Sequence, residues 1–143
     1  SDCMVTGYYN RPDATELALR NGWYLTCDFG YLADGELYVS GRKKDMIIVS
    51  GFNVYPNEVE AVAAACAGVA ECACVGKPDE KTGETVRLFI AKAPGATLCE
   101  QDVITHCRRE LAAYKVPKEV RFLDTLPKSN VGKILRKDLR ALA

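Results

Sequence analysis

The residues best suited to chemistry are Asp28 in the first part of the chain and Lys133 near its end, where Lys133 follows a glycine within residues 127–133. A carboxylate such as Asp28 can accept hydrogen bonds from the two neighbouring hydroxyls of a ribose. A lysine on a loop loosened by glycine can reach into a site and stabilise charge on a phosphate. Each residue alone would also fit a plain turn or a solvated loop, but their combination indicates nucleotide chemistry at a mobile site.

Further segments carry a recognisable pattern of residues over nearly the whole length: 7–15, 22–28, 41–58, 107–111, 114–118 and 127–133. In these segments the chain resembles the adenylate-forming acyl-CoA synthetases, and in particular the bacterial long-chain fatty acid CoA ligases. One departure is visible, because the family usually has glycine where this chain has Cys27. The turn beside Asp28 could therefore differ from that of the family.

The resemblance implies a ligase that joins a fatty acid to coenzyme A in two steps. The acid first reacts with ATP to give an acyl-adenylate and pyrophosphate, and the thiol of coenzyme A then displaces AMP. Lys133 is implied as the catalytic lysine, which stabilises charge on the transferring phosphoryl group. Asp28 and Arg42 are implied as ATP- and AMP-binding residues, on the ribose and on the ribose or phosphate respectively. A salt bridge from Arg42 to Asp45 or Glu36 is the structural alternative.

The resemblance also implies that a C-terminal lid rotates between the two steps about a hinge at Lys44. This residue lies in a charged stretch between two apolar runs, so its backbone could turn without disrupting a core. After rotation, Ser50, Gly51 and Phe52 would line the coenzyme A channel, with a plain turn as the alternative for Gly51. The sequence does not select which basic residues would bind the phosphates of coenzyme A or ATP. The candidates are Lys128, Arg136, Lys137, Arg140, Arg108, Arg109, Lys115 and Lys118.

The family's phosphate-binding loop, rich in serine, threonine and glycine, has no counterpart in this sequence. We therefore expect residues 1–43 to be the terminal segment of a large N-terminal adenylation domain, and residues 44–143 to be the lid. ATP, coenzyme A and Mg²⁺ are the implied cofactors, with the Mg²⁺ site in the large domain. The chain alone is expected to be inactive and to act with that domain on the fatty acid.

Composition narrows the class of protein further. With 19 basic and 19 acidic side chains in 143 residues, the chain gives no electrostatic reason to expect a nucleic-acid partner. Its seven cysteines and single histidine lack the spacing of a zinc site or of a disulfide framework, so we expect free core cysteines, no metal site and a reducing cytoplasm. No apolar run is long enough to span a bilayer, which favours a soluble protein. Peripheral contact with the inner face of the membrane is compatible with a fatty acid substrate.

The order of apolar runs predicts an α+β fold, in which helices flank a small, mostly antiparallel sheet and an arm precedes it. Helices are expected over 14–19, 56–67, about 98–112 and 134–142, and strands over 36–39, 46–49, 71–75, 86–92 and 120–123. Thr97 and Glu100 are the expected capping box of the third helix.

Two functional alternatives remain open at this point: a ligase for aryl or shorter acids, and an interaction module without enzymatic activity. Without its parent domain, the arm would expose apolar side chains such as Trp23, Tyr24 and Phe29, which could drive self-association of the chain. The sequence does not decide the acyl chain length, the oligomeric state or the orientation of the lid.

Overall fold

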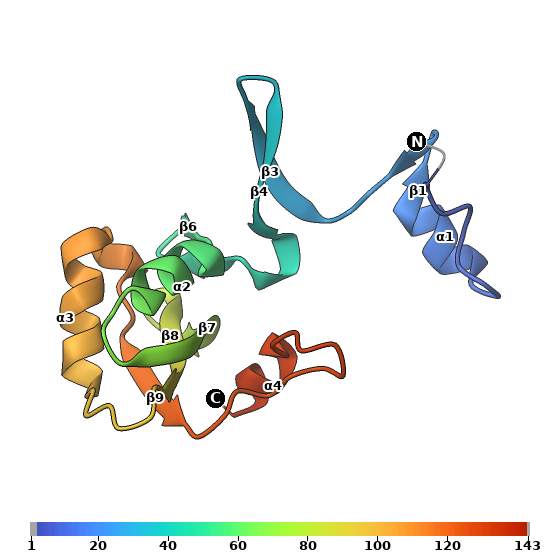
Figure 1. The fold of residues 1–143 in the computed structure, drawn as a ribbon. Coiled ribbons are helices and arrows are strands. Elements are labelled where there is room, and N and C mark those ends of the chain that lie inside the picture. The colour runs from blue at the N-terminus through green and yellow to red at the C-terminus, as the bar shows by residue number, and fades with distance from the viewer. Residues whose placement is uncertain (1–2, 143) are drawn as a thin grey trace.

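The computed structural model describes residues 3–142, which form an extended arm followed by a compact unit of sheet and helices (Figure 1). The arm contains α1 (Pro12–Ala18), β1 (Leu19–Arg20), β2 (Trp23–Tyr24), β3 (Asp28–Ala33) and β4 (Glu36–Arg42). None of residues 3–40 is buried. The arm therefore has almost no core of its own, as the sequence predicted.

Strands β3 and β4 form an antiparallel hairpin in which Asp28 lies opposite Arg42. Asp34 and Gly35 connect them, both with positive φ, which matches the right-handed twist of the flanking strands. The sequence reading predicted only residues 36–39 as a strand here. It missed β3 because both faces of this strand are largely exposed, so no alternation of apolar and polar residues marks it.

The compact unit is built on a five-stranded sheet. Its strands are β5 (Ile47–Val49), β6 (Phe52–Val54), β7 (Val69–Asp79), β8 (Gly83–Lys92) and β9 (Glu119–Leu123). The order is β6-β5-β8-β7, and β9 pairs with β8 in parallel, while the other pairings are antiparallel. The prediction of a small, mostly antiparallel sheet is confirmed.

Helices cover both faces of this sheet, and β8 shows why. The helices of the unit are α2 (Pro56–Ala64), α3 (Glu100–Glu110) and α4 (Arg136–Ala141). Leu88 and Ile90 pack in the cluster under α2 and α3, whereas Phe89 packs in a second cluster with Leu139 of α4. Since side chains alternate along a strand, β8 serves both clusters, and seven of its ten residues are buried. Burying a side chain such as Phe89 contributes about 1.5–3 kcal/mol.

Three cysteines, Cys66, Cys74 and Cys107, are buried in the cluster under α2 and α3 as free thiols. Burial raises the pKa of Cys107 to about 11, so this thiol stays protonated and behaves as a small apolar side chain. Among residues 3–142, no helix combines the length and the apolar character needed to cross a membrane.

The expected capping box of α3 is wrong. The helix begins at Glu100, its N-cap is Cys99, and the backbone N–H of Cys99 donates to Asp102 Oδ2 at 2.9 Å. Hydrogen bonds from Cys99 lower the pKa of Asp102. Glu100 instead accepts a hydrogen bond from the backbone N–H of Val120 on β9, at 3.0 Å. A tertiary contact thus uses the carboxylate that the sequence pattern assigned to the cap.

The carboxylate of Glu60 connects the two faces of the sheet around the edge strand β7. Its Oε1 accepts the backbone N–H of Cys74 at 2.7 Å, and its Oε2 lies 2.7 Å from Nη2 of Arg136. Glu60 belongs to α2 on one face, while Arg136 begins α4 on the other. One side chain therefore satisfies a free N–H of an edge strand and anchors the C-terminal segment.

Glu60→Gln is expected to lower the unfolding free energy by about 2 kcal/mol, because it removes the charge-assisted pair and leaves the Arg136 guanidinium without its partner. The glutamine oxygen can still accept the N–H of Cys74, so the change reports mainly on the ion pair. Urea denaturation of the chain measures it, with Glu16→Gln on the exposed α1 as the matched control. A loss no larger than that of the control would contradict this role.

A second charge cluster surrounds Glu119 on β9, and Arg87 is its buried member. Its carboxylate is bound by Arg87 Nη2 at 2.8 Å, Lys77 Nζ at 3.0 Å and Arg121 Nε at 2.7 Å. Arg87 is fully buried, and its Nε and Nη1 have no hydrogen-bond partner within the described chain. Desolvation raises the pKa of Glu119, but the hydrogen bonds from Lys77, Arg121 and Arg87 together outweigh it and lower this pKa to about 2.

Glu119→Gln is expected to flatten the pH dependence of stability in acid. The pKa of Glu119 falls on folding from 4.5 to about 2, so the ionised carboxylate stabilises the fold above pH 4.5. That contribution is lost as the pH falls from 4.5 to about 2. The variant should be less stable at neutral pH, because the charge of Arg87 stays buried without its counter-ion, and should lose less on acidification. Urea denaturation at several pH values tests this, and parallel curves for the two proteins would overturn it.

Candidate functional site

A hollow of about 890 Å³ lies between the base of the arm, the turn that follows it and the C-terminal segment. The turn is a short 3-10 helix, η1 (Lys43–Asp45). Six cations and one acid are among the residues that line the hollow: Arg42, Lys44, Lys133, Arg136, Lys137, Arg140 and Asp45. Lys133, Arg42 and Lys44 were singled out in the sequence for a catalytic, a nucleotide-binding and a hinge role. The fold brings these three residues to one cationic hollow.

Lys133 is presented on a tight turn. The N–H of Ser129 donates to the carbonyl of Lys133 at 2.8 Å, and the N–H of Lys133 donates to Ser129 Oγ at 3.2 Å. Gly132 has a φ of +78°, a left-handed conformation that glycine adopts without a steric penalty. The turn fixes the backbone of Lys133 while its side chain stays exposed beside the hollow.

The arginines and the lysines of the hollow differ in their partners. Arg136 binds Glu60, Arg140 Nη2 lies 2.6 Å from Asp45 Oδ1, and Arg42 Nε lies 3.3 Å from Asp28 Oδ1. Within residues 3–142, the side chains of Lys44, Lys133 and Lys137 make no ion pair or hydrogen bond. The arginines therefore hold the walls of the hollow together, and the lysines are free to neutralise an anion.

These pairs revise the earlier interpretation of the basic residues. Arg136 and Arg140 were considered as phosphate ligands, but both bind carboxylates of the protein. Arg42 makes neither of the alternative salt bridges, since its ion pair within residues 3–142 is with Asp28 and not with Asp45 or Glu36. The partner of Arg42 is Asp28.

Asp28 lies against Arg42 but is not among the residues that line the hollow. Its N–H donates to Thr26 Oγ1 at 3.1 Å, and the carbonyl of Cys27 accepts the N–H of Lys43 at 2.9 Å. Cys27 has a φ of +58°, which is the left-handed region that favours glycine. The cysteine therefore occupies this turn in a backbone conformation that a glycine would adopt freely.

Residues 50–52 form a separate feature at the turn between β5 and β6. Ser50 and Gly51 both have positive φ, as a two-residue hairpin turn requires, and a Cβ added at Gly51 would meet no heavy atom within 4 Å in the described part of the chain. Phe52 is 57% exposed and stacks on Tyr114 with the ring centroids 4.9 Å apart. None of the three lines the cationic hollow. Their role in a coenzyme A channel stays a prediction.

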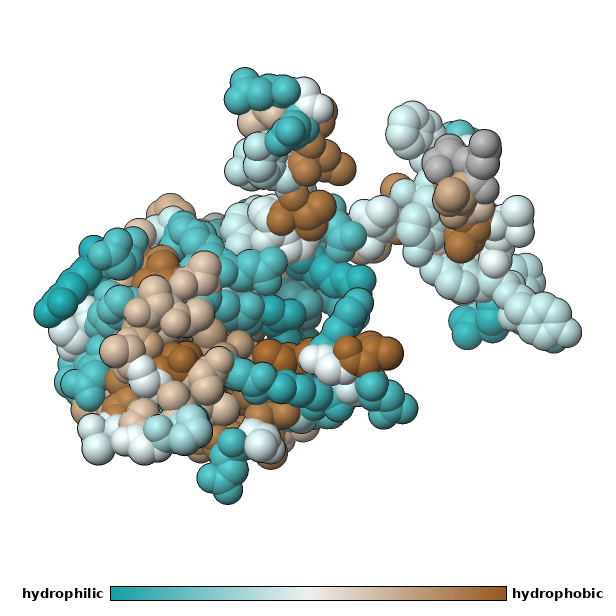
Figure 2. Space-filling view, in the orientation of Figure 1, coloured by the Kyte–Doolittle hydropathy of each residue, from teal (hydrophilic) through white to brown (hydrophobic). Residues whose placement is uncertain are grey.

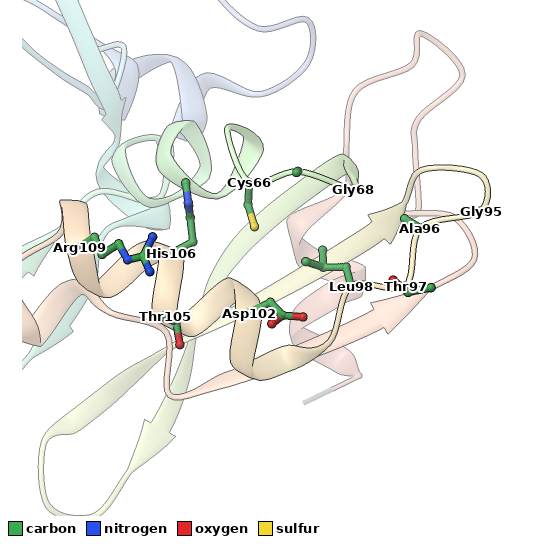
Figure 3. Close-up of a pocket in the computed structure, with 11 residues that line it drawn as sticks. Cys66, Gly68, Gly95, Ala96, Thr97, Leu98, Asp102, Thr105, His106 and Arg109 are labelled. Atoms are coloured by element: carbon green, nitrogen blue, oxygen red, sulfur yellow. The ribbon is translucent and has the colours of Figure 1, made fainter.

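A second hollow, of about 670 Å³, lies beside the end of α2 and along α3 (Figure 3). The side chains that line it are spread around an open depression. His106 Nε2 is hydrogen-bonded to the carbonyl of Val62 at 3.0 Å. Arg109 lines this hollow and is not among the residues that line the cationic one. No catalytic or nucleotide-binding residue singled out in the sequence lies here.

Sequence reasoning missed the acidic partners of the site. Asp45 was considered only as an alternative partner of Arg42, and no pairing was expected for Glu60. Each binds an arginine of α4 more than seventy residues away along the chain. No local pattern marks such a pair, because its two members meet only when α4 packs on the sheet.

Comparison with a family model and with curated proteins points to the same group of enzymes. Residues 58–133 match the AMP-binding enzyme C-terminal domain. A long-chain-fatty-acid–CoA ligase of Yersinia pestis is 54% identical over 138 residues, which cover 96% of this chain and 24% of that ligase. The chain thus spans about a quarter of the length of the curated relatives it matches.

Solved structures of MatB from Rhodopseudomonas palustris match in two forms. The ATP-bound form is 37% identical with a TM-score of 0.90, over 96% of this chain and 28% of that one. The apo form is 38% identical with a TM-score of 0.72, over 95% of this chain and 28% of that one. The family match covers more than half of the described residues, and the chain belongs to the family of AMP-binding enzyme C-terminal domains.

Proposed function

We propose that this chain is the C-terminal part of a long-chain fatty acid CoA ligase, an ATP- and CoA-dependent, AMP-forming acid–thiol ligase. The observation that carries the proposal is the unpaired Lys133, held on a tight turn beside a hollow whose arginines are already bound to carboxylates. The name and the 54% identity of the Yersinia pestis ligase support the reaction and the long-chain acid. In this proposal, residues 1–43 end the large adenylation domain and residues 44–143 form its lid.

In adenylation, a carboxylate oxygen of the acid attacks the α-phosphorus of ATP, a P–O bond forms and pyrophosphate leaves. Two anions must approach each other for this step. The ammonium of Lys133 would lie between them and offset the charge that develops on the phosphoryl oxygens. Asp28 would accept hydrogen bonds from the ribose hydroxyls, and Arg42, whose side chain is 61% exposed, would donate to the ribose or the phosphate.

In the second step, the thiol sulfur of coenzyme A attacks the carbonyl carbon of the acyl-adenylate and AMP leaves. We propose that the lid turns about Lys44 between the steps, which withdraws Lys133 and brings residues 50–52 to the thiol. The higher TM-score with the ATP-bound relative than with its apo form supports an adenylation orientation for the lid described here. Mg²⁺ is proposed to bind in the large domain, as the family resemblance implies.

The surface of the arm supports a missing partner domain. Figure 2 shows apolar side chains gathered on the β3–β4 hairpin, where Leu32 and Leu37 are 75% and 69% exposed. Trp23, at 76%, is exposed as expected, whereas Phe29 packs edge-to-face against Tyr55. We propose that the large domain covers this surface, and that the chain alone self-associates through it. We further place the ligase in the cytoplasm, with peripheral contact at the inner face of the membrane, where long-chain acids partition.

Lys133→Ala in the full-length ligase is expected to lower fatty acid-dependent pyrophosphate release by about 10²-fold or more, because the cation at the developing charge is lost. Thioester formation from prepared acyl-adenylate should change less than about twofold, since the lysine does not act in that step. Lys81→Ala, on the exposed turn between β7 and β8, is the matched control. Equal losses in both half-reactions would mean that Lys133 is structural and would contradict the proposal.

The isolated chain is expected to release no pyrophosphate from fatty acid and ATP, because it offers one wall of the site and lacks a phosphate-binding loop. Adding the separately produced large domain should restore some acid-dependent AMP formation, which Lys133→Ala should abolish. Pyrophosphate release by the chain alone would refute the division into arm and lid.

A further inference from the structure

The aromatic ring of Tyr55 joins the lid to the arm. Tyr55 directly precedes α2, and its ring packs edge-to-face on Phe29 of β3, with centroids 5.9 Å apart and planes at 72°. The backbone of Gly41 lies beneath the same ring, since a Cβ at this position would be 3.8 Å from Tyr55 Cδ1. Gly41 is buried although it belongs to the otherwise exposed arm. The base of the hairpin is therefore covered by the ring of Tyr55.

Asn57, two residues further on, makes a second contact with the arm. Its Nδ2 donates to the carbonyl of Ser40 at 3.3 Å, and its Oδ1 accepts from Arg136 Nη2 at 3.3 Å. Ser40 is itself fixed to the opposite strand, because its hydroxyl donates to the carbonyl of Phe29 at 3.1 Å. Asn57 thus links the arm to the helix that follows Lys133.

Both contacts connect residues on opposite sides of the proposed hinge. Phe29 and Ser40 precede Lys44, whereas Tyr55 and Asn57 follow it. A rotation about Lys44 that moves the lid as a body must separate these partners, while the pairs of Arg136 and Arg140 within the lid can persist. A contact made in one of two orientations stabilises that orientation alone.

We propose that Tyr55 and Asn57 are positioning residues that hold the lid in the orientation in which Lys133 faces the base of the arm. The inference rests on the proposed function. In this inference Tyr55 and Asn57 contribute to adenylation without touching the substrate. They raise the fraction of molecules in which Lys133 faces the base of the arm. An edge-to-face pair of this kind shifts the equilibrium between two orientations by about two- to tenfold.

The test uses the full-length ligase with Tyr55→Leu, Phe29→Leu and the double variant. Each single change should lower acid-dependent pyrophosphate release by about two- to tenfold, and the double variant should be no slower than the slower single one. Thioester formation from prepared acyl-adenylate should stay unchanged or rise, because the lid then leaves this orientation more readily. Tyr31→Leu is the matched control, since its ring stacks on Tyr38 of the same hairpin, on the arm side of Lys44.

The outcomes separate a positioning role from a structural one. Equal losses in both half-reactions, additive losses in the double variant, or rates like those of Tyr31→Leu would each overturn the inference. Asn57→Ala alters an exposed side chain and should also slow pyrophosphate release without slowing thioester formation. This variant tests the inference if Tyr55→Leu does not fold. If the wild-type enzyme and Tyr31→Leu both fail to form acyl-adenylate, the proposed function itself is refuted. If both are active, the other variants test the positioning role alone.

Discussion

The carboxylate of Glu60 is the point on which the geometry of the site depends. It binds the guanidinium of Arg136 and the free backbone N–H of Cys74, so α2, the edge of β7 and α4 meet at one group. Arg136 follows Lys133 by three residues, so this ion pair helps to fix the position of the lysine turn relative to the sheet. Leu139, fully buried under the sheet, adds an apolar anchor on the same helix. A helix of only six residues is held in place by these tertiary contacts, since so short a helix has little stability of its own.

The division between arginines and lysines gives the cationic hollow its chemical character. Arginine presents a rigid fork of donors that suits a lasting pair with a carboxylate, whereas lysine carries a compact charge on a flexible stem. Here Arg136 and Arg140 bind acids of the lid, and Lys133 keeps its ammonium exposed. The carboxylates neutralise the arginines, which lets several cations share one hollow without strong repulsion. Lys133 is left as a mobile charge for an incoming anion.

The arm and the proposed lid are joined by few contacts, and this suits the rotation that we propose. Strong ion pairs, such as Arg140 with Asp45, lie within the lid and can survive a rotation about Lys44. The contacts across Lys44 are weaker: one pair of rings, and a hydrogen bond of 3.3 Å from Asn57. Contacts as weak as these favour one orientation by only a small free energy. A small change in free energy can therefore reverse the equilibrium between the two orientations.

The sequence by itself determined the family resemblance, the residues Asp28, Arg42, Lys44 and Lys133, and most of the lid's strands and helices. It could do so because β8 is a nearly continuous apolar run, because α3 carries periodic apolar residues, and because the residues within each motif are adjacent in sequence. It missed β3, whose exposed faces leave no pattern, and it misplaced the cap of α3, where Glu100 is used by Val120. Only the tertiary structure paired Glu60 with Arg136, Asp45 with Arg140 and Tyr55 with Phe29. Such contacts join residues distant in the chain, so they exist only after the sheet and its helices have packed, and no local pattern of residue types can specify them.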